Sequence, residues 1–297
     1  MEITSSVGEP QGGVLYLVGT PIGNLEDLSP RALRVLAGVH RVACEDTRHS
    51  GLLLHRLGIR ATLLSFHEHN QQQRLETLLL GLAAGESLAL ISDAGLPGIS
   101  DPGETLVAAC RAAGHRVVCI PGPCALTTAL VSSGLPSGRF CFEGFLPPRP
   151  PQRRQRLQEL RQEPRTLVLY EAPHRLLALL SDILELLGDR PLQVARELTK
   201  RHEEQVGPTV SAALAHFRAH PPQGECTVVL GGAPPLEAPR WDDDRLREEL
   251  LQLRRSGLNS SEAARQLAQL SGLPRRQLYA LLHRESGADA AAPEAAD

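Results

Sequence analysis

The sequence is poor in lysine, in aromatic residues and in cysteine pairs. Lys200 is the only lysine among 31 basic residues, and aromatic residues make up 3% of the 297 residues. The six cysteines form no C-x-x-C pair, and the first residues lack the basic and apolar regions of a secretory signal. No apolar run approaches the roughly 18 residues of a membrane span. We therefore expect a reduced protein of the cytoplasm with no membrane role.

Two common cofactor signatures are also missing. The chain contains neither the Rossmann G-x-G-x-x-G nor the P-loop G-x-x-x-x-G-K-[ST]. A net charge of −3 gives no global attraction to nucleic acid, although local basic patches still act over about 10 Å. The hydrophobic fraction of 42% and the charged fraction of 22% exclude a fibrous or disordered chain.

The preference for arginine over lysine has two explanations. A genome rich in G and C produces it without any functional cause. Alternatively, position 200 needs a compact ammonium that can lose its proton, which a guanidinium cannot do.

The periodicity of the first half predicts an α/β fold with a parallel sheet. Strands are expected at residues 13–18, 41–44, 87–91 and 116–120, with helical patterns between them. Residues 140–151 contain Phe-Leu-Pro-Pro-Arg-Pro-Pro and are interpreted as a stiff connector, neither helix nor strand. A second αβ series follows, with strands at 166–170, 192–195 and 227–230 and helices at 152–162, 174–187 and 211–219.

After residue 235 the pattern becomes purely helical. Helices are expected at 243–255, 260–270 and 275–284, with Asn259 and Glu262 as a start signal and Gly272 and Pro274 at the next turn. Three short helices with tight turns resemble a helix-turn-helix. The expected organisation is a flexible tail at 1–12, αβ domains at 13–146 and 147–232, a three-helix domain at 242–285 and a tail at 286–297.

Three loops after predicted strands carry the candidate ligand site. Residues 92–103 contain three glycines, two prolines, two aspartates and two serines, a composition that suits close backbone approach to a ligand. Two acids and no base favour ribose hydroxyls or a cationic ligand over a polyphosphate. Pro21, in the loop at 19–24, lacks the N–H that a phosphate cradle needs. Small Cys124 and Ala125, in the turn at 121–125, leave room for an adenine or a ribose, although each loop alone is also compatible with a plain turn.

The motifs taken together resemble the ribosomal RNA small subunit methyltransferase I family of the tetrapyrrole-methylase class. The resemblance covers residues 13–284 and rests on G-T-P-I-G-N-L-E-D-L-S-P-R-A, E-D-T-R-H-S, H-E-H-N, S-D-A-G-L-P-G-I-S-D-P-G, P-G-P-C-A, Y-E-A-P-H-R, E-L-T-K and G-E-C-T-V-V-L-G, in this order. It implies two αβ domains of tetrapyrrole-methylase type with the cofactor S-adenosylmethionine in the cleft between them. The implied reaction is methyl transfer to the ribose 2′-hydroxyl of a decoding-centre cytidine in 16S rRNA within the small ribosomal subunit, by a homodimer.

The resemblance also implies site residues. The cofactor-binding set is Pro21, Asp93, Ala94, Gly95, Pro97, Ile99, Cys124, Ala125, Tyr170 and Glu197. The set on the acceptor side, expected to be catalytic, is Glu45, Asp46, Arg48, His67, Asn70 and Lys200. Leu96 and Cys124 depart from the usual threonine or methionine and the usual serine, which puts side-chain hydrogen bonds at these two positions in doubt.

Several chemical alternatives remain for these clusters. A general base that accepts the hydroxyl proton is sought among the acceptor-side residues. His67 and His69 with Glu45 or Glu68 also contain metal-ligand chemistry, but their spacing matches no known zinc motif, and we expect no metal. Lys200 is expected to touch either the reacting ribose or its phosphate. RNA contacts are expected at Arg149, Arg153, Arg154, Arg275 and Arg276, although a charge run is also typical of a solvated face.

Two other functions compete with the rRNA methyltransferase. A methylase of the same class could act on a tetrapyrrole or another small molecule, but it would need neither basic patches nor C-terminal helices. A DNA-binding regulator could use the αβ portion to sense a nucleoside. The polar clusters outside the cofactor loop argue against that regulator.

Overall fold

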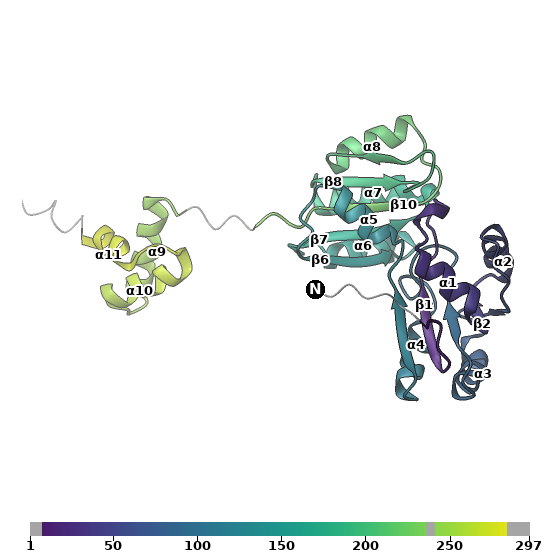
Figure 1. The fold of residues 1–297 in the computed structure, drawn as a ribbon. Helices are drawn as coiled ribbons and strands as arrows, with labels where there is room; N and C mark the ends of the chain where they lie inside the picture. The colour runs from purple at the N-terminus through teal and green to yellow at the C-terminus, as the bar shows by residue number, and fades with distance from the viewer. Residues whose placement is uncertain (1–7, 236–240, 284–297) are drawn as a thin grey trace, which may run out of the picture. The chain divides into compact units, whose positions relative to one another are not determined.

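The computed structural model describes residues 8–235 and 241–283, and these residues form two compact units. The first unit ends at Ala233 and the second begins at Pro234. The first unit contains two sheets, which are separate in Figure 1, and the second unit contains helices α9 (Asp243–Arg255), α10 (Ser260–Ser271) and α11 (Arg275–His283). Within the described residues, no helix combines the length and the apolar character needed to cross a bilayer.

The first sheet is wholly parallel and has the strand order β3-β2-β4-β1-β5. Alternation along β1 builds a core on each face, because successive side chains of a strand point to opposite sides. Tyr16 and Val18 pack with helices α1 and α2, whereas Leu15 packs with α3 and α4. The strands are β1 (Val14–Val18), β2 (Arg41–Cys44), β3 (Leu63–Ser65), β4 (Leu88–Leu90) and β5 (Arg116–Ile120), and the helices are α1 (Pro30–Gly38), α2 (Thr47–Arg56), α3 (Gln71–Ala83), α4 (Glu104–Ala112) and α5 (Ala125–Ser132), with a 3₁₀ turn η1 (Leu25–Asp27).

The second sheet has the order β6-β7-β10-β8-β9, and only β6 and β7 are parallel. Leu167 and Leu169 of β7 face a core formed with α6, α7 and α8. Val168 faces the other side, where it packs with Leu126 and Leu130 of α5. Helix α5, which follows the first sheet in the chain, therefore covers one face of the second sheet. The two αβ lobes share this core. The strands are β6 (Phe140–Phe145), β7 (Thr166–Glu171), β8 (Leu192–Arg196), β9 (Glu204–Val206) and β10 (Cys226–Leu230), and the helices are α6 (Pro150–Glu159), α7 (Pro173–Leu187) and α8 (Val210–Ala219).

The segment expected to be a connector is instead an edge strand followed by a helix. Residues 140–145 form β6, parallel to β7, and the register shifts between Phe142 and Gly144. Gly144 has a φ of 61°, so the irregularity hides the alternation that marks a strand. Pro150 lies in the first turn of α6, where its missing N–H costs no hydrogen bond. The second sheet therefore begins inside the range 13–146 expected for the first domain.

The described part of the expected N-terminal tail is attached to the first lobe. Glu9 pairs with Arg31 of α1 at 2.8 Å, and the N–H of Gln11 donates to the Tyr16 hydroxyl at 2.8 Å. These contacts place residues 8–12 against α1 and β1. The C-terminal tail at 286–297 lies outside the described residues.

The second unit is a three-helix domain with its own core. Helices α9 (Asp243–Arg255), α10 (Ser260–Ser271) and α11 (Arg275–His283) surround a cluster that includes Leu246, Leu250 and Leu267. Asn259 and Glu262 form a reciprocal capping box at the start of α10, as their spacing predicts. Gly272 ends this helix with a left-handed φ of 70°.

Candidate functional site

Three loops at the carboxyl ends of adjacent parallel strands form the base of the site. β1 lies between β4 and β5, so the loops that follow these strands meet at one edge of the sheet. Thr20 and Gly95 exchange two backbone hydrogen bonds of 2.9 and 3.1 Å, and the Thr20 hydroxyl donates to the Ser92 carbonyl at 3.0 Å. These bonds hold the loop after β1 to the long loop after β4.

Glycines allow these loops to approach each other. A Cβ on Gly19 would lie 3.2 Å from Cα of Gly122, and a Cβ on Gly122 would lie 3.1 Å from Cα of Gly19. Gly95 has a φ of +84°, a conformation that L side chains rarely adopt. The glycine-rich composition of the loops is therefore a packing requirement.

A cavity of about 430 Å³ lies above this base, between the two αβ lobes. Five of its lining residues are carboxylic acids, and none of the described residues in the lining is basic. Such a wall disfavours a polyphosphate and favours a ligand that carries positive charge and hydroxyl donors. The lining residues are Ile22, Glu45, Asp93, Ala94, Gly95, Leu96, Ile99, Ser100, Asp101, Cys124, Ala125, Phe145, Tyr170, Glu171, Ala172, Pro173, Ala195, Leu198, Glu225, Cys226 and Thr227.

Two aspartates from the long loop face the cavity with unsatisfied or perturbed carboxyl groups. Asp93 Oδ1 is buried and has no hydrogen-bond partner in the protein. Burial, together with the nearby charges of Glu45 and Asp93, raises the pKa of Asp101 to about 6, although the Ser92 hydroxyl opposes the shift. The unpartnered oxygen of Asp93 can therefore accept a hydrogen bond from a ligand in the cavity.

Tyr170 from β7 connects the second lobe to the start of α5. The N–H of Leu126 donates to the Tyr170 hydroxyl at 3.0 Å. Cys124, the residue before α5, offers no side-chain cap, so the tyrosine satisfies one of the free N–H groups of the helix start. Phe142 and Phe145 hold the tyrosine ring at centroid distances of 5.0 and 5.6 Å. Burial raises the pKa of Tyr170 above its usual range, so the phenol stays protonated.

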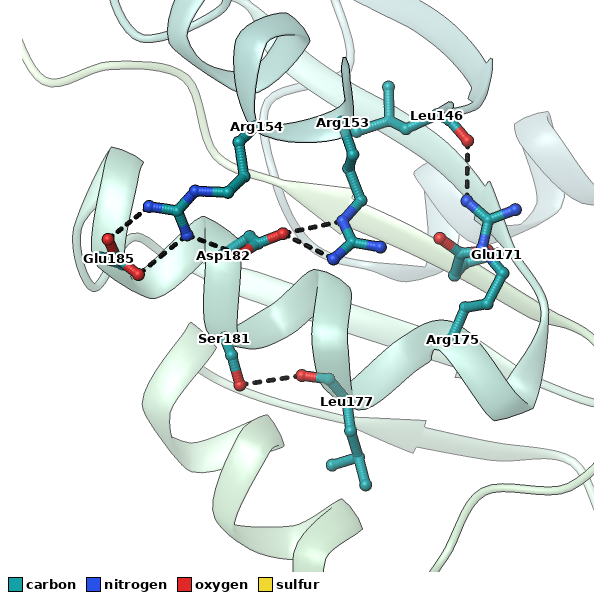
Figure 2. A network of polar contacts seen from close by, with 9 residues as sticks. All are labelled: Leu146, Arg153, Arg154, Glu171, Arg175, Leu177, Ser181, Asp182 and Glu185. Atoms are coloured by element: carbon teal, nitrogen blue, oxygen red, sulfur yellow. Dashed lines mark hydrogen bonds and ion pairs between the residues drawn. The ribbon is translucent and has the colours of Figure 1, made fainter. Parts of the chain in front are cut away.

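Glu171, the next residue, belongs to the buried wall of the cavity. Its side chain is fully buried and pairs with Arg175 at 3.1 Å, and Arg175 also donates to the Leu146 carbonyl at 2.7 Å (Figure 2). Burial raises the pKa of Glu171, whereas the Ala172 N–H and the Arg175 charge lower it. Glu171 is not among the expected site residues, although it lies within the Y-E-A-P-H-R motif.

The arginines expected to bind RNA near α6 are largely engaged in ion pairs. Arg153 is 5% exposed and pairs with Asp182 of α7 at 2.7 Å. Arg154 binds Asp182 at 2.7 Å and also Glu185 (Figure 2). Arg153 therefore has a structural role, because a buried guanidinium cannot reach a phosphate. Arg149 and Arg276 are exposed, and Arg275 is exposed while it contacts the Ser261 hydroxyl.

Lys200 lies between two glutamates beside the cavity. Its Nζ donates to Glu197 Oε1 at 2.9 Å and to Glu225 Oε2 at 3.0 Å, and Glu225 lines the cavity. Burial lowers the pKa of Lys200, but the hydrogen bonds to both glutamates outweigh it, and the net shift is upward. The ammonium therefore keeps its proton near neutral pH, which removes the case for a lysine that must become neutral.

Other predicted residues lie around the cavity. Seven of the ten cofactor-binding predictions line it, and the other three, Pro21, Pro97 and Glu197, do not. Of the acceptor-side set, only Glu45 lines the cavity. Asp46 caps α2 by accepting from the Arg48 N–H at 2.7 Å, and the hydrogen bonds from Arg48 and His49 lower its pKa.

His67 and Asn70 form a local turn before α3. Asn70 Oδ1 accepts from the His67 N–H at 2.9 Å, and Asn70 Nδ2 donates to the Ser65 carbonyl at 3.3 Å. The rings of His67 and His69 meet edge to face at 5.9 Å. Across residues 8–235 and 241–283, no group of three or more His, Cys, Asp or Glu side chains is arranged to hold a metal ion.

Comparison with known proteins identifies relatives along most of the chain. Residues 14–215 match the family model of the tetrapyrrole (corrin/porphyrin) methylases. A ribosomal RNA small subunit methyltransferase I from Synechocystis sp. is 53% identical over 91% of this chain and 97% of its own length. Two solved structures of uroporphyrin-III C-methyltransferase from Thermus thermophilus share the fold. One has a TM-score of 0.53 at 25% identity and covers 74% of this chain and 94% of its own. The other, complexed with S-adenyl homocysteine, has a TM-score of 0.50 at 21% identity and covers 73% and 96%.

Proposed function

The chain belongs to the tetrapyrrole methylase family, within the group of ribosomal RNA small subunit methyltransferase I, and on this premise we propose its reaction. It is an S-adenosylmethionine-dependent methyltransferase, and we propose that its acceptor is the ribose 2′-hydroxyl of a decoding-centre cytidine in 16S rRNA. The cavity at the strand ends, lined by five carboxylic acids and by no described basic residue, supports the cationic cofactor, and the relatives that carry the ribosomal RNA name support the acceptor.

The residues of the cavity fit S-adenosylmethionine. The buried Asp93 Oδ1 lacks a partner, as expected for an acceptor of ligand hydroxyl or amino groups. Gly95 lines the cavity without a side chain, and the small residues Cys124 and Ala125 line it at the start of α5. The acidic wall suits the positive charge of a sulfonium. We propose Asp93, Ala94, Gly95, Ile99, Cys124, Ala125 and Tyr170 as the binding residues.

When bound, the cofactor supplies an electrophilic methyl group on a cationic sulfur. The protein then has to orient the acceptor hydroxyl, a contribution that reaches effective molarities of about 10⁵ M in favourable cases. Tyr170 fixes the second lobe against α5, and the Thr20–Gly95 bridge fixes the two loops of the first lobe. The cavity walls are therefore held in place before the acceptor arrives. Groups that are already in place need no reorganisation at the moment of reaction.

We propose that RNA contacts come from exposed arginines of both units. Arg149 lies at the start of α6, and Arg275 and Arg276 open α11. Structured RNA is recognised largely through its shape and phosphates, for which exposed guanidinium groups are suited. A tetrapyrrole acceptor would use neither group of arginines, and the relatives at high identity carry the ribosomal RNA name.

We also propose a homodimer, located in the cytoplasm and acting on the small subunit. The family resemblance supports the dimer, and Val131 of α5, 73% exposed, offers apolar surface for a second copy. All six cysteines are unpaired, as in a reducing compartment. Sedimentation equilibrium across a concentration series reports the dimer directly, and a single monomer mass would contradict it.

The reaction is tested with small ribosomal subunits from cells that lack the corresponding gene. Purified protein and a methyl-labelled donor should place the label on one cytidine ribose, detected by nuclease digestion and mass spectrometry. Asp93→Asn should lower the rate by tenfold or more because it replaces one oxygen of a buried carboxylate by a donor and removes the negative charge, whereas Asp27→Asn, at an exposed position of η1, should leave the rate unchanged. Label on a base, or on uroporphyrinogen but never on RNA, would contradict the proposed acceptor.

A further inference from the structure

Asp101 is held at the cavity by an unusual backbone on its N-terminal side. Ser100 has a φ of 59°, a left-handed conformation that is uncommon for residues other than glycine. A Cβ on Gly144 of β6 would lie 3.1 Å from Ser100 Oγ, so the absence of a side chain at Gly144 lets the loop end pack against the second lobe. Backbone strain of this kind is concentrated at functional sites. Here it directs the next residue, Asp101, to the cavity wall.

The charged and titratable groups around Asp101 come from three elements. Glu45 follows β2, Asp93 lies in the same loop after β4, and Tyr170 comes from β7. Burial and the charges of the two acids raise the pKa of Asp101 to about 6, while the Ser92 hydroxyl opposes the shift. A carboxylate with this pKa is ionised at neutral pH yet binds a proton more readily than an ordinary aspartate, as a general base requires.

The other candidate proton acceptors are less suited to this role. Lys200 is already protonated and held by two glutamates. His67 and Asp46 do not line the cavity. Glu171 is paired with Arg175 and buried in the wall.

We propose that Asp101 accepts the proton of the acceptor hydroxyl during methyl transfer, an inference that rests on the proposed function. The ribose oxygen forms a bond to the methyl carbon as the methyl–sulfur bond breaks, and that electron pair remains on sulfur. The hydroxyl proton moves to a carboxylate oxygen of Asp101. The products are the methyl ether, a neutral thioether and protonated Asp101, so charge and atoms balance.

A kinetic experiment tests this role with a matched control. Asp101→Asn keeps the shape of the side chain but cannot accept a proton, and Glu104→Gln changes an exposed acid three residues away. Single-turnover methylation of small subunits should fall by about 10²-fold or more in Asp101→Asn and stay unchanged in Glu104→Gln. The wild-type rate should rise with pH up to an apparent pKa near or below 6 and then level off. This dependence should be absent in Asp101→Asn.

A binding experiment tests the same group without RNA. Near pH 6 the wild-type carboxyl is partly protonated, and a cationic sulfonium beside it should displace that proton. Calorimetry in two buffers of different ionisation enthalpy should therefore show proton release with S-adenosylmethionine and less with S-adenosylhomocysteine, which lacks the charge. Asp101→Asn should bind S-adenosylhomocysteine normally, which shows that it is folded, and should lose the difference in proton release.

The outcomes separate the two proposals. If wild type methylates no subunit, the proposed function fails. If wild type methylates the subunit but Asp101→Asn retains its rate and pH profile, Asp101 is not the acceptor. If Asp101→Asn does not fold, a wild-type rate that is flat between pH 5 and 8, together with equal proton release for both ligands, overturns the inference.

Discussion

At the scale of single residues, the arginines of α6 show most clearly that a cluster of charges in the sequence does not reveal what each charge binds. The sequence places several arginines close together, as in an RNA-binding surface, yet Arg153 and Arg154 face α7 and bind its acids (Figure 2). Sequence spacing could not reveal this, because Asp182 lies 29 positions after Arg153. For Asp101, the sequence predicts that its loop binds a ligand. Only the fold brings Glu45, from the loop after β2, close to the Asp101 carboxyl group.

The Arg153–Asp182 pair gives a prediction for stability. Asp182→Ala should lower the free energy of unfolding by about 3–5 kcal/mol, because it leaves a buried guanidinium without its charge partner. Denaturant unfolding followed by circular dichroism measures the loss.

Glu185→Ala is the matched control for Asp182→Ala. It removes only the exposed partner of Arg154 and should leave the free energy of unfolding nearly unchanged, because solvent screens exposed ion pairs. Equal effects of the two substitutions would show that the Arg153–Asp182 pair is not specially important.

At the scale of elements, strand and helix boundaries followed the periodicity except where the signal was short or irregular. β3 and β9 have three residues each and were not predicted, whereas the equally short β4 lies in a continuous apolar run, and the bulge at Gly144 interrupts β6. The turn of Glu197 to Lys200 is another irregular segment, with positive φ at Glu197 and Thr199. It packs directly on the loop after β1.

Gly23 provides the test of this contact between lobes. A Cβ at Gly23 would collide with Lys200 Cγ and would lie 2.9 Å from the Leu198 carbonyl. Gly23→Ala should therefore lower the free energy of unfolding by about 1–3 kcal/mol and weaken S-adenosylhomocysteine binding, because Leu198 lines the cavity. Unfolding curves and calorimetry measure both effects.

Gly138→Ala is the control for this substitution. A Cβ at Gly138 meets no atom within 4 Å, and the backbone there has no positive φ, so the change should be neutral or slightly stabilising. Unchanged cofactor binding in Gly23→Ala would show that the packing of this turn does not shape the cavity.

At the scale of the whole molecule, the hydrophobic cores divide the chain more clearly than any linker composition. Val168 of the second sheet shares a core with Leu126 of α5, which joins the two αβ lobes into one unit. The residues of α9, α10 and α11 have a separate core. The expected boundary near residue 146 therefore lies after the first strand of the second sheet, and both sheets belong to one compact unit.

This division predicts the result of a truncation. Removing residues 234–297 should leave an αβ unit that binds S-adenosylhomocysteine with unchanged affinity, because every lining residue of the cavity precedes Ala233. Affinity for the small subunit should fall, because Arg275 and Arg276 are removed. Calorimetry and a binding assay at fixed salt measure the two quantities.

The double variant Arg275→Ala/Arg276→Ala refines the truncation experiment. It should reproduce part of the affinity loss and reduce the salt dependence of binding by up to about two phosphate contacts. Unchanged subunit affinity in both the truncated chain and the double variant would assign RNA binding to the αβ unit alone.

The sequence by itself determined the α/β class, the order of most elements, the three ligand loops and the family, because periodicity and local motifs are properties of neighbouring residues. The tertiary structure decided what each charge does. Lys200, Arg153 and Asp101 lie in similar polar stretches, yet one is held by two glutamates, one is buried in an ion pair, and one faces the cavity. Burial and distant partners set these differences. Both arise only when segments far apart in the chain pack together.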